Sequence, residues 1–181
     1  MMAARSTPAT ILTPTATDES AGAAAELADR IGGAVAAVTD PEYPDLTIAD
    51  LGILERVTVL APAPGEAGPS VLVELVPTVL GCPALRTIEL DVVAAALAAG
   101  GVAVEVRFLH EPVWSPERIT GPARDRLARD YTITLRGRDG SLRCPLCGSA
   151  AVTERSAIGP TRCRAVYYCA DCRNPVEVIR R

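Results

Sequence analysis

Two Cys-x-x-Cys pairs near the C-terminus constrain the fold of this chain more than any other feature. Cys144-Pro-Leu-Cys147 and Cys169-Ala-Asp-Cys172 are separated by 21 residues, slightly more than the roughly 15–20 typical of paired zinc knuckles. Each short pair presents two thiolates toward one point, and four thiolates suit a tetrahedral Zn²⁺. Residues 141–181 have too little apolar core to fold alone, so we predict a zinc ribbon that the metal stabilises.

Two alternatives remain open for these cysteines: a pair of redox-active Cys-x-x-Cys sites, and a rubredoxin-like iron centre. Gly148 supplies the permissive turn after the first pair, and residues 166–168 and 176–179 are expected to be short ribbon strands. We call the four cysteines of the two pairs, Cys144, Cys147, Cys169 and Cys172, the tetrad. Cys163 lies outside it. We expect it to be a packed neighbour in the ribbon strand, with a ligand role as the alternative.

A second cysteine lies between a predicted strand and a predicted helix. Residues 70–76 are aliphatic and β-branched, as in a buried strand, and residues 84–99 form a helical pattern that ends at Gly100-Gly101. Cys82 therefore falls at the helix N-terminus, where unpaired N–H groups and the helix dipole favour thiolate. A small buried cysteine filling a turn is the alternative.

The remaining pattern predicts a small α/β domain. Residues 23–38 have helical periodicity, and residues 39–44 form a turn-rich break with two prolines. Residues 53–60 and 70–76 should form a hairpin through a long loop, and residues 102–109 a strand parallel to the second. The expected fold class is α/β, with an α-β-β-α-β domain followed by a C-terminal β zinc ribbon.

We divide the chain into four parts on this basis. Residues 1–22 are rich in Thr, Ala and Pro and are expected to be a disordered tail. Residues 23–117 are the α/β domain, and residues 118–140 are a short helix capped by Thr120 and a linker with a short β segment. Residues 141–181 are the ribbon.

Composition excludes some classes of function. The chain has no lysine and a formal net charge of −4, which argues against a general nucleic-acid binder. It lacks an apolar run of the roughly 18 residues that a membrane span needs, and an apolar signal-peptide core. Six cysteines in this pattern fit metal or redox chemistry in a reducing compartment, so we expect a cytoplasmic protein.

Three short motifs carry a resemblance to a known family. Asp40-Pro41-Glu42, Asp50-Leu51-Gly52-Ile53 and Thr78-x-x-x-Cys82-Pro83 resemble the small iron–sulfur assembly domain of SufT-like proteins. With Trp114, the short helix near Ile119 and the ribbon segment from Cys163 to Cys169, residues 23–181 resemble the PaaD family. Members are encoded with the bacterial phenylacetyl-CoA epoxidase as one of its components.

The resemblance implies an accessory role in phenylacetate degradation. PaaD-like proteins are associated with maturing the metal centres of the multicomponent epoxidase, in its di-iron catalytic subunit or its iron–sulfur reductase. Cys82 matches the functional cysteine of the family and would be a transient thiolate ligand for iron or an iron–sulfur cluster. Two departures are Tyr43-Pro44 after Glu42 and Val79-Leu80 before Gly-Cys-Pro. The second makes the surroundings of Cys82 more apolar, which would raise its pKa.

Four other residues are candidates to assist Cys82. Asp40, Glu42 and Asp50 could supply oxygen ligands to iron, although such carboxylates more commonly cap turns and helices. Thr78 could hydrogen-bond the Cys82 turn or simply end the strand.

Two further residues receive structural interpretations. His110 is the sole histidine, which disfavours a histidine-rich hydrolytic metal site, and we expect it in a surface turn. Trp114 is expected to pack within the chain, with a role as a partner anchor the alternative.

The function that the sequence favours is therefore a non-enzymatic accessory protein that assembles or delivers an iron or iron–sulfur centre to an epoxidase. A structural or docking subunit of the oxygenase complex, with Cys82 merely packed, is the second hypothesis. A thiol–disulfide enzyme that uses the Cys-x-x-Cys pairs is the third. No Ser-His-Asp set, Walker loop or dinucleotide fingerprint is present. A homodimer is expected by analogy with small α/β assembly domains.

Overall fold

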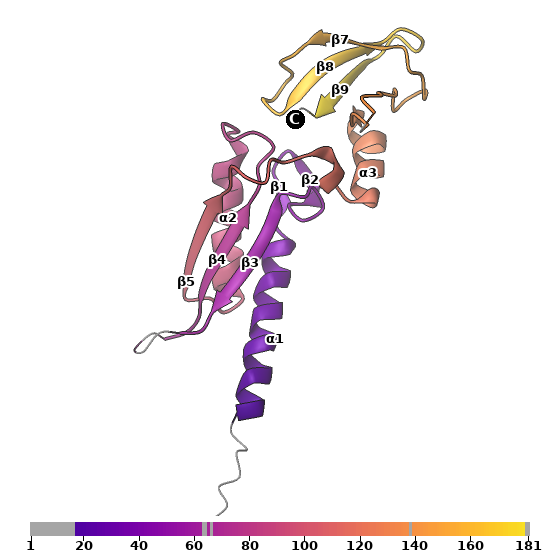
Figure 1. Ribbon diagram of the computed structural model, residues 1–181. Coiled ribbons are helices and arrows are strands. Elements are labelled where there is room, and N and C mark those ends of the chain that lie inside the picture. The colour runs from indigo at the N-terminus through magenta and orange to yellow at the C-terminus, as the bar shows by residue number, and fades with distance from the viewer. Residues whose placement is uncertain (1–16, 63–64, 66, 138, 180–181) are drawn as a thin grey trace, which may run out of the picture.

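The structure is a computed structural model that describes residues 17–62, 65, 67–137 and 139–179 (Figure 1). Its first part, also called the α/β part below, contains α1 (Thr17–Ala36), β1 (Thr39–Asp40), β2 (Tyr43–Thr47), β3 (Leu54–Leu60), β4 (Ser70–Leu75), α2 (Ala84–Ala98) and β5 (Ala103–Phe108). Its second part contains the short 3₁₀ helix η1 (Pro116–Arg118), α3 (Gly121–Tyr131), β6 (Ile133–Thr134), β7 (Val152–Ser156), β8 (Arg164–Cys169) and β9 (Pro175–Ile179). The predicted fold class, an α/β domain followed by a β ribbon, is confirmed.

The first part is built on a three-stranded sheet in the order β3-β4-β5. The β3–β4 pair is antiparallel and the β4–β5 pair parallel, as predicted. Alternate residues of β4 are buried, and α1 and α2 contact each other and the sheet. The period-two pattern of β4 and the helical pattern of α2 therefore meet in one core, which includes Ile31, Val35, Val71, Val73, Ile88 and Val92.

Two expectations about the N-terminal region need correction. Helix α1 begins at Thr17, so the end of the predicted tail, residues 17–22, is helical; residues 1–16 lie outside the described residues. The alanine run at 23–25 favours extension of the helix toward the N-terminus. The turn-rich break instead contains the β1–β2 hairpin. This two-stranded sheet tolerates Pro44, which is exposed on it, because a proline can sit on a strand edge.

The segment after β5 docks onto the turn that precedes β3. Trp114 donates from Nε1 to the Leu51 carbonyl at 3.0 Å, and Arg118 donates from Nε to the Gly52 carbonyl at 2.7 Å. Gly52 has a φ of +65°, and a Cβ there would collide with the Arg118 Cβ. Only glycine fits this contact. The Asp50-Leu51-Gly52 motif therefore fixes the path of the chain toward the ribbon.

Thr120 caps α3 as predicted, because its side chain accepts a hydrogen bond from the Ala123 N–H at 3.4 Å. Beyond α3, the predicted short β segment is β6, which pairs with β9 in parallel. The sheet of the ribbon therefore begins within the segment predicted as a linker.

The ribbon is a four-stranded sheet in the order β6-β9-β8-β7. It has its own small core around Cys144, Tyr167 and Val176. Ile179, at the end of β9, instead belongs to the core of the α/β part. Burying a side chain of this size contributes about 2 kcal/mol, so the end of β9 attaches the ribbon to the first part (Figure 1).

Among the described residues, no helix combines the length and the apolar character needed to cross a membrane.

Candidate functional site

The four cysteines of the two Cys-x-x-Cys pairs come together as predicted. Their sulfur atoms all lie within 4.8 Å of one another. Cys144 Sγ lies 3.6 Å from Cys172 Sγ, and Cys147 Sγ lies 3.6 Å from Cys169 Sγ. A Zn²⁺ ion with four bonds of about 2.3 Å would set neighbouring sulfurs about 3.8 Å apart. The tetrad therefore fits a tetrahedral metal ion.

The two pairs share a local backbone geometry. The Gly148 N–H donates to the Cys144 carbonyl at 2.8 Å, and the Arg173 N–H donates to the Cys169 carbonyl at 2.9 Å. Both donors occupy the position after the second cysteine and have a left-handed backbone, with φ of 74° and 60°. Gly148 adopts this conformation without cost, whereas Arg173 is strained in it. The turn predicted at Gly148 thus recurs at Arg173.

Cys82 lies in the turn before α2, as predicted. Its N–H donates to the Val79 carbonyl, and its own carbonyl accepts from the Leu85 N–H. The side chain is half-buried, and its pKa is raised from the usual value. Burial is the largest cause, and the charges of Glu42 and Asp40 add to it. The backbone N–H groups of Ala84 and Leu85 lower the pKa less. The expected thiolate-favouring effect of the helix N-terminus is therefore real but outweighed.

A small cavity opens beside Cys82 at the junction of the two parts of the chain. Its volume is about 30 Å³, room for one or two water-sized groups. Asp40, Glu42 and Thr78 line it from the first part, and Cys163 lines it from the ribbon. Most of the remaining wall is apolar. We refer to it as the Cys82 cavity.

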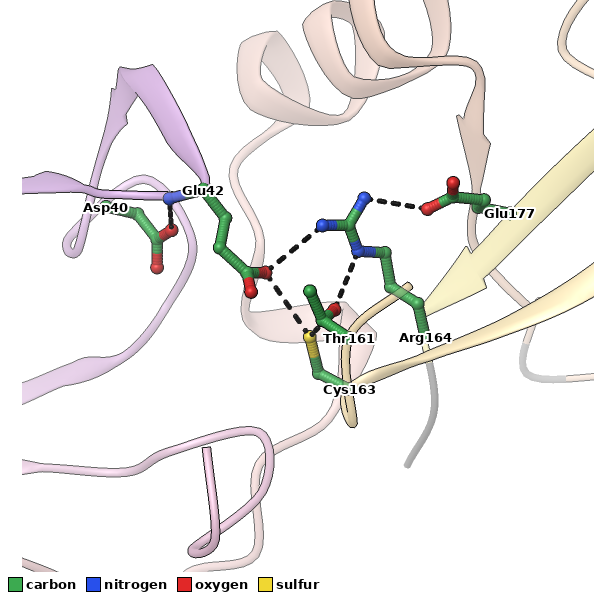
Figure 2. Close-up of polar contacts among 6 residues, drawn as sticks. All are labelled: Asp40, Glu42, Thr161, Cys163, Arg164 and Glu177. Atoms are coloured by element: carbon green, nitrogen blue, oxygen red, sulfur yellow. Dashed lines mark hydrogen bonds and ion pairs between the residues drawn. The ribbon is translucent and has the colours of Figure 1, made fainter. Parts of the chain in front are cut away.

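Cys163 is buried next to Glu42 (Figure 2). Its thiol donates to Glu42 Oε2 at 3.6 Å and lies 3.1 Å from Thr161 Oγ1. Burial raises the pKa of the Cys163 thiol, as do the charges of Glu42 and Cys82, while Thr161 and Arg164 lower it. Cys163 is therefore packed just before β8 in the ribbon, and it also contacts Glu42 of the α/β part.

Arg164 links the two parts through the same carboxylate. Its Nη2 lies 3.3 Å from Glu42 Oε2, and its Nη1 lies 2.7 Å from Glu177 Oε2. The guanidinium also lies over the ring of Tyr43, 5.4 Å from its centre. These groups are mostly shielded from solvent, so the arginine fixes Glu42 in place and joins β8 to the β1–β2 turn (Figure 2).

Asp40 and Tyr43 complete the polar side of the cavity. Asp40 is 6% exposed, and its Oδ1 accepts from the Glu42 N–H at 2.7 Å. Burial raises the pKa of Asp40, and the N–H groups of Glu42 and Tyr43 partly offset this. The Tyr43 side chain is 4% exposed, and its hydroxyl has no hydrogen-bond partner among the described residues.

The other sequence candidates separate into two groups. Thr78 lines the cavity, whereas Asp50 does not lie there. The Asp50 carboxylate accepts hydrogen bonds from Thr47 and Thr120, which is the turn-capping role. Trp114 is buried and packs within the chain as expected. His110 lies exposed just after β5, as expected.

Comparison with known proteins shows the family of this chain. Residues 128–180 match the family model described as the PaaD zinc beta ribbon domain. An Escherichia coli (strain K12) protein, named as the D component of a "Putative 1,2-phenylacetyl-CoA epoxidase", is 33% identical over 150 residues, which cover 79% of this chain and 86% of that protein. The chain belongs to the PaaD family. A solved structure titled as a domain of unknown function, DUF59, from Bacillus anthracis is 25% identical, with a TM-score of 0.48, and covers 58% of this chain and 94% of that one.

Sequence reasoning missed the place of two residues in this PaaD-family chain, Cys163 and Tyr43. Cys163 precedes the alternating stretch Ala165, Tyr167 and Cys169, so period-two burial could have placed it on the buried face of β8. No sequence signal indicates which surface that end of β8 meets. Tyr43 stood out only as a bulky residue where the family resemblance led us to expect an aliphatic one.

Proposed function

We propose that this protein is a non-enzymatic accessory protein that assembles or delivers an iron or iron–sulfur centre to a 1,2-phenylacetyl-CoA epoxidase in phenylacetate degradation. Cys82 is the transient thiolate ligand for the cargo. The observation that carries the proposal is the half-buried Cys82 sulfur in a cavity with the Asp40 and Glu42 carboxylates, apart from the tetrad. The similarity to a protein named as a component of this epoxidase supports the choice of recipient.

The tetrad is assigned a structural role in this proposal. Cys144, Cys147, Cys169 and Cys172 hold Zn²⁺, and the sulfur spacing supports this choice. Catalytic zinc keeps one coordination position open for water or substrate, whereas four protein thiolates fill all four. The zinc stabilises the ribbon and leaves the exchange of cargo to Cys82.

The surroundings of Cys82 suit reversible binding. Burial and the nearby carboxylates raise its pKa, which keeps the sulfur protonated at neutral pH. Iron therefore binds as the thiol proton leaves, and it departs as the proton returns. A site that binds against this opposition releases its cargo more readily than one with a preformed thiolate.

The location and partners follow from the same proposal. None of the six cysteines forms a disulfide, which suits the reducing cytoplasm. The partners are the catalytic or the reductase subunits of the epoxidase. A homodimer stays a prediction.

The test is epoxidase maturation in cells that carry the Cys82→Ser variant. We expect the epoxidase subunits to accumulate normally but to contain less iron and to lose activity. Iron content of the purified subunits and protein abundance are the measurements. Full metallation and activity with Cys82→Ser would show that Cys82 does not handle the cargo.

A docking subunit without metal transfer is the second candidate function. Its contact residue would be Leu80, which lies two residues before Cys82 and is 49% exposed. In this case Leu80→Asp abolishes co-purification with the epoxidase, while Cys82→Ser leaves both co-purification and iron content unchanged.

A further inference from the structure

The Cys82 cavity gathers donor groups from three separate segments. Cys82 comes from the turn before α2, Glu42 from the β1–β2 turn, and Cys163 from the loop before β8. Glu42 and Cys163 are 121 positions apart in the sequence, yet the Cys163 thiol already donates to the Glu42 carboxylate. Residues that carry two thiols and a carboxylate therefore line one small space.

The Tyr43 hydroxyl gives an independent indication that the cavity receives a ligand. The side chain is 4% exposed and lines the cavity, but its hydroxyl has no partner among the described residues. A buried polar group without a hydrogen bond costs about 1–3 kcal/mol. A water molecule held in the cavity, for example by a metal ion, is the kind of partner that this hydroxyl lacks.

The size of the cavity limits what can occupy it. A volume of about 30 Å³ accepts an ion with a water molecule, since a single water needs roughly 10–15 Å³ on the same measure. A CoA thioester or an intact iron–sulfur cluster is far larger. The space therefore fits a single metal ion.

The donor set selects the kind of ion. Thiolates favour softer metals, and carboxylates favour hard ions such as Mg²⁺. A mixed set of sulfur and oxygen suits an intermediate divalent ion, and Fe²⁺ is the one that the proposed cargo requires. On binding, Cys82 and Cys163 each lose a thiol proton to solvent, and no electron is transferred.

We propose that Cys163, together with Cys82 and the Glu42 carboxylate, binds a single Fe²⁺ ion in the Cys82 cavity, so that the ribbon supplies one of the ligands. The proposal rests on the iron-delivery function above and names its substrate as a mononuclear ferrous ion. It also gives the ribbon a direct role: the structural zinc holds β8, and β8 positions Cys163.

Glu177→Gln provides the matched control for Glu42→Gln, because both carboxylates pair with Arg164. The guanidinium pairs with Glu42 on one side and Glu177 on the other, but only Glu42 lines the cavity. Glu42→Gln and Glu177→Gln each remove one of these ion pairs. An effect of Glu42→Gln alone therefore reports a ligand rather than a lost ion pair.

The experiment titrates ferrous ammonium sulfate into the full-length, zinc-loaded protein without oxygen. Iron per chain is measured after desalting, together with the thiolate-to-iron absorption. We expect about one iron per chain in the wild type and in Glu177→Gln. We expect binding at least about 10-fold weaker in Cys82→Ser and Cys163→Ser, and intermediate binding in Glu42→Gln. Zinc content verifies that each variant retains the ribbon.

A second measurement covers the case in which Cys163→Ser does not fold. In the wild type, Fe²⁺ should slow alkylation of Cys82 and Cys163 with the same concentration dependence, because one ion covers both sulfurs. Protection of Cys82 alone would overturn the proposal.

The outcomes separate this proposal from the function on which it rests. Normal iron binding by Cys163→Ser but not by Cys82→Ser would overturn the shared site and leave iron delivery through Cys82 intact. A wild-type protein that binds no Fe²⁺ would also overturn the shared site, and the cell assay with Cys82→Ser would still decide the delivery function.

Discussion

The tetrad and the Cys82 cavity use the same element, sulfur, in opposite ways. The tetrad takes all four sulfurs from the ribbon, and they lie within 4.8 Å of one another. The Cys82 cavity takes its donors from distant segments and mixes thiols with carboxylates. Among the described residues, only the tetrad brings three or more ligand side chains so close together.

The tetrad is suited to holding a metal ion permanently, and the Cys82 cavity to binding one and releasing it. Four converging thiolates form a closed site that is worth a large part of the folding free energy of a small ribbon. A looser site must gather its donors and displace protons before it binds, so its affinity is lower and its cargo can leave. The looser site also depends on the closed one, because the ribbon carries Cys163.

The largest expected effect comes from breaking the closed site. Cys147→Ser should lose the zinc and unfold the ribbon, since metal binding supplies about 10–16 kcal/mol in comparable modules. Strands β3, β4 and β5 should keep their amide-exchange protection, because their core is formed mainly within the first part. Native-state hydrogen exchange measures both regions, and equal loss in both would show that the two parts are one folding unit.

A smaller effect is expected from uncoupling the two sites. Arg164→Met removes two ion pairs and leaves the partly buried Glu42 and Glu177 unpaired. We expect a loss of about 1–2 kcal/mol in urea unfolding, less than for a fully buried pair. The control is Arg107→Met, which breaks an exposed pair with Glu105 and should cost little, because solvent screens such pairs. Equal losses would mean that Arg164 does not join the parts.

Substitutions at Gly148 and Arg173, the residues that follow the two Cys-x-x-Cys pairs, should change the stability of the ribbon in opposite directions. Gly148→Ala places a side chain at a φ of 74° and should destabilise the ribbon by about 1 kcal/mol. Arg173→Gly relieves a φ of 60° and should stabilise it by a smaller amount. Zinc affinity from a chelator competition measures both. Weaker zinc binding by Arg173→Gly would show that the arginine side chain contributes more than its backbone costs.

The smallest expected effect concerns the charge around the looser site. Only thiolate reacts with iodoacetamide, so in the metal-free cavity the alkylation rate of Cys82 should rise with pH and reach half its maximum above the ordinary 9.0. Glu42→Gln removes a charge that raises this pKa. The pKa of Cys82 should therefore fall, and the reaction at pH 8 should become faster. Glu177→Gln is the control. If both variants speed the alkylation of Cys82 equally, the cause is the lost ion pair with Arg164 and not the charge of Glu42.

Local patterns predicted most of the fold. The α2 helix, the strand pairs and the Thr120 cap depend on periodicity and on nearby residues, and each was placed to within one or two positions. The tetrad could also be predicted from the sequence, because the spacing of each Cys-x-x-Cys pair dictates its geometry. The β1–β2 hairpin was missed because Pro41 and Pro44 suggest a break, and only the two-stranded context makes them compatible with strands.

The looser site could be predicted only in part. The motifs pointed to Cys82, Asp40, Glu42 and Thr78, and the structure brings these four to one cavity. It does not bring Asp50 there. The position of Cys163 depends on how the ribbon packs on the α/β part, through contacts such as Ile179 and Arg164. Packing between distant segments leaves no periodic trace in the sequence.

The alternation along β8 also restricts how the ribbon can diverge. Cys163 and Cys169 are an even number of residues apart and share the buried face, with Ala165 and Tyr167 between them. Inserting or deleting one residue would turn one of the two cysteines outward. Loops elsewhere in the ribbon can change length over evolution, whereas this stretch can change only its side chains.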